Sequence, residues 1–225
     1  MLVDPQLFLV IACRFAFSFR FRTMSTVVFF FCGAHTAEES WWEEQWASSL
    51  LSSGLAQDVR IRAAPLDGAY GTELPHWWCQ YHAEPWEQWQ DATACKTFDA
   101  DIAKTATGIC LEIAEVIAAG QSVAFVGSSN GGHVAVELST IFRTRFLILN
   151  SSVPLRHQEG SLLDSGIPTV MTVGSGESNF GGASAMRTIA RRVGAWRVEF
   201  EGRHCEETWA TMWDAINATK HWLRI

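Results

Sequence analysis

The stretch that decides the fold is Val123-Ala-Phe-Val-Gly-Ser-Ser-Asn-Gly-Gly-His133. Its first four residues are apolar, as in a strand that is buried on both faces of a parallel sheet. The pattern G-x-S-x-G follows, centred on Ser129, and a helix is predicted over residues 131–142. Strand, sharp turn and helix in this order predict that Ser129 sits at the edge of a sheet in a strained backbone conformation.

The two glycines of this pattern have a physical purpose. Gly127 and Gly131 lack side chains, so the strand and the helix can approach closely. The N-terminus of the helix then points at Ser129, where its N–H groups and dipole favour a developing negative charge. The pattern therefore predicts a nucleophilic serine, and a purely structural glycine-rich turn is the alternative.

Apolar strands alternate with helices on both sides of this stretch. Strands are predicted at 27–32, 59–64, 122–127, 145–150, 167–174 and 196–201, and helices at 38–53, 98–119, 131–142, 182–193 and 205–223. This alternation implies right-handed crossovers and a mostly parallel sheet that helices cover on both faces. We expect a three-layer α/β/α sandwich with about six core strands and no large lid domain.

A serine hydroxyl needs a general base, and the base needs an acid to orient it. His204 is the candidate base, because it follows a predicted strand through Gly202 and precedes the last helix. Glu177 is the candidate acid, in the loop after the strand 167–174, although it could also be an ordinary exposed loop glutamate. His133 and His35 could line the site without acting as base.

An oxyanion needs two hydrogen-bond donors. We expect one to be the backbone N–H of Asn130, directly after the nucleophile. The other should come from the loop after the first core strand, and the N–H of Ala34 is the candidate there.

Together these residues resemble the α/β-hydrolase superfamily, from about Met24 to the C-terminus. Within it they are most similar to the small carboxylesterase, phospholipase and acyl-protein thioesterase branch, or to the related fungal-type small serine hydrolases. The resemblance rests on Cys32-Gly-Ala-His35, Gly71-Thr-Glu-Leu-Pro-His-Trp-Trp78, Gly127-Ser-Ser-Asn-Gly131, Gly174-Ser-Gly-Glu177 and Gly202-Arg-His204. The chain departs from that branch at Cys32, where the branch has histidine, and at Glu177, where it has aspartate.

The resemblance implies hydrolysis of carboxylic esters or thioesters through an acyl-enzyme on Ser129, with no metal or organic cofactor. The substrate would be a small molecule with an apolar acyl group, and His35, Trp77 and Trp78 are candidates for its pocket. The tryptophans of this region could instead simply cover the sheet. A neutral His204 would make activity rise through about pH 6 to 7. The alternative function is a catalytically silent binding or interaction protein of the same fold.

Composition limits the remaining possibilities. The chain has 225 residues and a net charge of -7, which argues against nucleic acid as a partner. Its six cysteines form no C-x-x-C pair, and free thiols are expected. No apolar run is long enough for a transmembrane span.

Residues 1–23 are interpreted as an extension before the catalytic domain, 24–225. This extension is an organelle transit segment, or else a poorly ordered extension or an added edge strand, so the compartment is cytoplasmic or an organelle. The sequence does not predict an oligomeric state.

Overall fold

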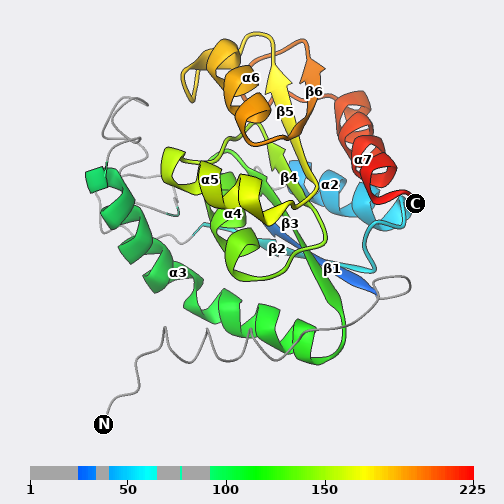
Figure 1. Cartoon of the computed structure of the whole chain (residues 1–225). Helices are drawn as coiled ribbons and strands as arrows, with labels where there is room; N and C mark the ends of the chain where they lie inside the picture. Colours follow the sequence, from blue (N-terminus) through cyan, green and yellow to red (C-terminus); the bar gives the residue numbers. More distant parts are fainter. Residues whose placement is uncertain (1–24, 34–40, 65–76, 78–91) are drawn as a thin grey trace.

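A single sheet of six parallel strands forms the centre of the computed structural model, which describes residues 25–33, 41–64, 77 and 92–225 (Figure 1). The strand order is β2-β1-β3-β4-β5-β6, and every neighbouring pair is parallel. The strands are β1 (Thr26–Phe31), β2 (Asp58–Arg62), β3 (Ser122–Ser128), β4 (Leu147–Asn150), β5 (Thr169–Gly174) and β6 (Trp196–Phe200). The predicted parallel sheet is confirmed.

Helices cover both faces of this sheet. One face packs against α2 (Trp41–Ser52) and α7 (Trp209–Leu223). The other packs against α3 (Ala92–Ala118), α4 (Gly131–Ile141), α5 (Arg156–Ser165) and α6 (Gly182–Arg192). Alternate residues of one strand enter the two cores, because successive side chains of a strand point to opposite faces. The three-layer architecture expected from the sequence is confirmed.

The central strands explain the continuous apolar runs in the sequence. Every residue of β1 and of β3 is buried. The rings of Phe29 and Phe125, one from each strand, lie 6.2 Å apart in one of the two cores. A strand that helices cover on both sides has no face for polar residues, so the alternation of exposed strands is lost.

The main difference from the sequence prediction is helix α5, which the sequence analysis leaves without an assignment. Only Gln158 and Leu162 of this helix are buried, so it has almost no apolar pattern to recognise. Helix α7 also begins four residues later than predicted. The backbone of Cys205 has a φ of 55°, which is not helical, and the Thr208 side chain caps the helix by accepting from the N–H of Thr211.

Some sequence-based expectations fall outside the described residues. They are the N-terminal extension 1–23, the beginning of the helix predicted from residue 38, and the region 65–91 except Trp77. Within the part of the chain that is described, none of the helices combines the length and apolar character needed to cross a bilayer.

Helix α4 approaches the ends of β1 and β3 so closely that no side chain fits between them. A Cβ on Gly131 would lie 2.3 Å from the carbonyl oxygen of Phe31, and one on Gly127 would lie 2.5 Å from the Cα of Gly132. Both contacts are with backbone, which cannot move aside as the end of a flexible side chain can. The glycines of the pattern are therefore required by packing.

We predict that Gly131→Ala lowers the free energy of unfolding by about 3 kcal/mol or more, because the added methyl group overlaps backbone. The matched control is Gly160→Ala. Gly160 lies inside helix α5, and a methyl group added there would meet nothing within 4 Å, so alanine should stabilise by about 0.5 to 1 kcal/mol. Urea unfolding measures both, and equal stability of the two variants would contradict the packing argument.

Candidate active site

Ser129 lies directly after β3, on the turn into α4. Its φ is 50°, in the left-handed region that residues other than glycine rarely adopt. Three hydrogen bonds hold this conformation. The N–H of Ser129 donates to the carbonyl of Asn150 at 3.0 Å, and its own carbonyl accepts from the N–H of Gly132 at 3.0 Å and from the hydroxyl of Ser152 at 2.6 Å. The strained serine that the sequence predicts is present.

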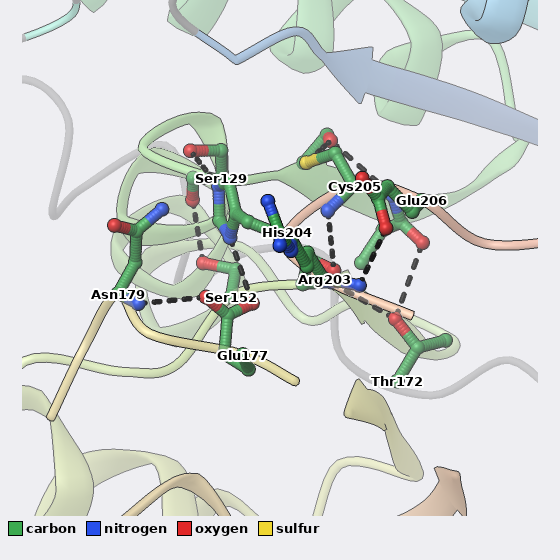
Figure 2. Close-up of polar contacts among 12 residues, drawn as sticks. Ser129, Ser152, Thr172, Glu177, Asn179, Arg203, His204, Cys205 and Glu206 are labelled. Atoms are coloured by element: carbon green, nitrogen blue, oxygen red, sulfur yellow. Dashed lines mark hydrogen bonds and ion pairs between the residues drawn. The ribbon is translucent and has the colours of Figure 1, made fainter. Parts of the chain in front are cut away.

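Two side chains from other loops meet the hydroxyl of Ser129 in a hydrogen-bonded chain (Figure 2). His204 Nε2 lies 2.9 Å from Ser129 Oγ, and His204 Nδ1 lies 2.8 Å from Glu177 Oε2. The side chain of Glu177 is fully buried, and that of His204 is 19% exposed. The structure therefore brings together the three residues that the sequence analysis selected.

Backbone pairing between two loops brings the acid and the histidine together. The loop after β5 carries Glu177, and the loop after β6 carries His204. The N–H of Ser175 donates to the carbonyl oxygen of Phe200 at 2.8 Å, and the N–H of Gly176 donates to the carbonyl oxygen of Gly202 at 2.8 Å. These bonds continue the β5–β6 pairing beyond the strands, so the two loops leave the sheet side by side.

The loop after β5 also holds the acid and covers the imidazole. The second oxygen of Glu177 accepts from the N–H of Asn179 at 2.8 Å. The ring of Phe180 lies 5.5 Å from that of His204 and 5.6 Å from that of His133. Burial, and then the charge of His157, lowers the pKa of His133 to about 3. His133 is therefore neutral at physiological pH and borders the site from helix α4.

The surroundings of His204 favour its protonated form. Burial by itself lowers the pKa of this imidazole. Hydrogen bonds to Cys205 and Glu177, together with their negative charge when ionised, outweigh burial and raise the pKa above its ordinary value of 6.5. The imidazole can therefore hold a proton that it takes from a neighbouring group.

The structure describes only two of the other predicted site residues, Asn130 and Trp77. Asn130 is fully buried and is the N-cap residue of α4. Ala34, His35 and Trp78 lie outside the described residues. Trp77 is 1% exposed, its ring lies 5.6 Å from Phe31 in the core, and its indole N–H donates to the Cys32 carbonyl at 2.8 Å. Trp77 therefore packs against the sheet, as in the alternative that the sequence left open.

The sequence analysis missed a group of buried polar residues behind His204. Ser151, Thr172 and Glu207 form hydrogen bonds with one another there. The sequence carries no signal for this group, because the pair Glu206-Glu207 before a helix is typical of an exposed loop. In the part of the chain that is described, no three His, Cys, Asp or Glu side chains gather as metal ligands, and Cys32 and Cys205 are free thiols.

No family model matches the sequence, and no curated protein is significantly similar to it. Solved structures do match. SOBER1 from Arabidopsis thaliana, crystallised as a point variant, is 15% identical, with 88% of this chain and 99% of that chain covered and a TM-score of 0.60.

Two further matches come from bacteria. A protein of Xanthomonas campestris pv. campestris assigned to the alpha/beta superfamily of hydrolases is 14% identical (88% and 98% covered, TM-score 0.53). A carboxylesterase from Mesorhizobium loti is 17% identical (88% and 88% covered, TM-score 0.51). At these identities the comparisons show the fold, which is that of the α/β hydrolases.

The surroundings of His204 give a prediction that does not depend on any activity. In an NMR titration, we expect the His204 imidazole to titrate above 6.5, and both Glu177→Gln and Cys205→Ala to lower that value, because each removes a group that favours the charged ring. His204→Ala identifies the signal. An unchanged titration in both variants would contradict the role assigned to these two neighbours.

Proposed function

We propose that this chain, which has the α/β-hydrolase fold, is a serine hydrolase that cleaves carboxylic esters or thioesters through an acyl-enzyme on Ser129. The observation that carries the proposal is the hydrogen-bonded chain from Ser129 Oγ through His204 to Glu177, with 2.9 Å and 2.8 Å between the heavy atoms. A hydroxyl, an imidazole and a carboxylate in this order form the arrangement that activates a serine for acyl transfer.

In the proposed first step, Ser129 Oγ attacks the carbonyl carbon while His204 Nε2 takes the hydroxyl proton. The negative charge of Glu177 stabilises the imidazolium that forms and fixes the ring so that Nε2 faces the serine. Collapse of the tetrahedral intermediate transfers the proton from His204 to the leaving alcohol or thiol. Water then repeats the sequence on the acyl-enzyme and releases the carboxylic acid.

The tetrahedral oxyanion would be bound at the N-terminus of α4. Asn130 follows the nucleophile and begins that helix, so its backbone N–H is the proposed first donor. Ala34 N–H is the proposed second donor. Cys32 lies two residues before Ala34 and is fixed at the end of β1. Its N–H donates to the carbonyl oxygen of Arg62 at 3.0 Å, and its carbonyl oxygen accepts from the indole N–H of Trp77. Each oxyanion donor contributes roughly 3 kcal/mol to transition-state binding.

Two features support an ester or thioester as the substrate. The site supplies a nucleophile and a general base, which suffice for esters with good leaving groups. The carboxylesterase from Mesorhizobium loti shares the fold. The apolar character of the acyl group stays a proposal that rests on the resemblance in sequence.

The proposal predicts that a fluorescent fluorophosphonate labels the wild-type protein and that Ser129→Ala and His204→Ala abolish labelling. Both variants should also lower kcat for 4-nitrophenyl esters by at least about 10⁴-fold, since the residues act as a unit. Ser128→Ala, one residue away, is the matched control and should still be labelled. A folded wild-type protein without labelling or turnover would favour the alternative of a silent binding protein.

The activity should also depend on pH. His204 must be neutral to accept the serine proton, and Glu177 and Cys205 raise its pKa. We therefore expect kcat/KM to rise with pH and to level off above pH 7. A histidine with an ordinary pKa would instead give a rise over about pH 6 to 7. Initial rates from pH 5 to 10 measure this, and a profile that is flat over the whole range would speak against His204 as the base.

A further inference from the structure

Another buried glutamate besides Glu177 lies three residues after His204. Glu207 is 5% exposed, whereas its neighbour Glu206 is exposed and accepts from the N–H of Arg203 at 2.8 Å. One carboxylate oxygen of Glu207 accepts hydrogen bonds from the hydroxyls of Ser151 and of Thr172, the latter at 3.0 Å. In Figure 2, Glu177 lies below His204, whereas Cys205 and Thr172 lie to its right.

The Ser151 hydroxyl joins this carboxylate to the backbone next to His204. Its oxygen accepts from the N–H of Cys205 at 3.1 Å, while its proton goes to Glu207. A hydroxyl whose proton is directed to a carboxylate turns a lone pair toward the other partner. Glu207 thus fixes the orientation in which Ser151 binds Cys205.

The peptide between His204 and Cys205 needs such support. Cys205 has a φ of 55°, and a left-handed conformation in a residue other than glycine costs of order 1 to 3 kcal/mol. The conformation of this peptide decides where the imidazole of His204 leaves the backbone. A change of a few tens of degrees there would move Nε2 away from Ser129.

Hydrogen bonds to the sheet hold the group formed by Ser151, Thr172 and Glu207 in place. Thr172 belongs to β5, and its hydroxyl accepts from the N–H of Ser151, which directly follows β4, at 2.9 Å. Both residues are fully buried. The loop after β6 is therefore tied to the ends of two central strands through Glu207.

A carboxylate in this place is costly to the fold, which implies that it serves a purpose. The other oxygen, Oε2, is buried without a hydrogen-bond partner in the described part of the chain. Burial raises the pKa of Glu207, while hydrogen bonds from Ser151 and Thr172 and the charge of a protonated His204 act in the opposite direction. Glu177, on the loop after β5, is the carboxylate that is hydrogen-bonded to the His204 ring.

We infer that Glu207 is a positioning residue for the general base: through the Ser151 hydroxyl it holds the Cys205 N–H, and with it the imidazole of His204, in line with Ser129. The inference rests on the proposed function, because it assigns Glu207 to the same hydrolytic site. Glu177 orients the ring directly, and Glu207 orients the backbone from which the ring extends.

The test compares Glu207→Ala and Glu207→Gln in the full chain, with the exposed Glu201→Gln as control. With 4-nitrophenyl butyrate, Glu207→Ala should lower kcat about 10- to 100-fold and leave KM within about twofold, because a displaced base slows chemistry more than binding. Glu207→Gln keeps an oxygen that accepts from both hydroxyls, so kcat should stay within about threefold of wild type. Glu201→Gln should match wild type.

Ser151→Ala tests the hydroxyl that connects Glu207 to the N–H of Cys205. It also replaces Glu207→Ala as the test if that variant does not fold. It should lower kcat about as much as Glu207→Ala. The double variant should be no worse than either single variant, since both break one connection. Additive losses would overturn the inference, as would full kcat in Glu207→Ala despite lower stability. A loss in Glu207→Gln as large as that in Glu207→Ala would assign the effect to charge and would also overturn it.

An NMR measurement separates failure of this inference from failure of the proposed function. The His204 Nδ1–H proton, hydrogen-bonded to Glu177, should give a downfield signal that His204→Ala removes. In Glu207→Ala and Ser151→Ala we expect this signal to broaden or shift, and in Glu207→Gln to persist. If the wild-type protein neither hydrolyses esters nor reacts with the phosphonate, the proposed function fails. An unchanged signal in both alanine variants overturns the positioning role whether or not the protein is active.

Discussion

Helix α4 lies directly against the ends of β1 and β3, and the position of Ser129 depends on this close approach. Gly131 meets the carbonyl of Phe31, and Gly127 meets Gly132, at distances that exclude a methyl group. The chain must therefore turn from strand to helix within two residues, and Ser129 takes up the turn with a φ of 50°. Hydrogen bonds to neighbouring loops offset the strain. The turn presents the serine hydroxyl and the helix N-terminus in one place.

The same edge of the sheet supplies the other groups, because the carboxyl ends of parallel strands lie together. Glu177 follows β5 and His204 follows β6, and the two loops stay paired for several residues beyond the strands. Four of the five described residues other than glycine with positive φ lie at or beside the site: Ser129, Ser151, Phe180 and Cys205. Backbone strain is thus concentrated where side chains must be aimed, and the buried core around it maintains the strained geometry.

His204 is held from two directions. Glu177 bonds to its ring, and the buried group of Ser151, Thr172 and Glu207 bonds to the backbone that follows it. A buried carboxylate with one unpaired oxygen destabilises a fold in isolation. Its presence beside a strained peptide is the kind of local conflict that proteins retain at functional sites.

The sheet, its layers and the three side chains that meet in the candidate site could be predicted from the amino-acid sequence, because each leaves a local signature. Continuous apolar strands indicate burial on both faces, and the pattern around Ser129 needs glycines at fixed spacing. Glu177 and His204 could be selected because each follows a strand whose end the sequence predicts. The polar group behind His204 could not be predicted, since Ser151, Thr172 and Glu207 meet only when three strands pair, and nothing distinguishes Glu207 from the exposed Glu206 in the chain. Helix α5 and the buried position of Trp77 were likewise decided by packing, which overrides a weak or ambiguous local pattern.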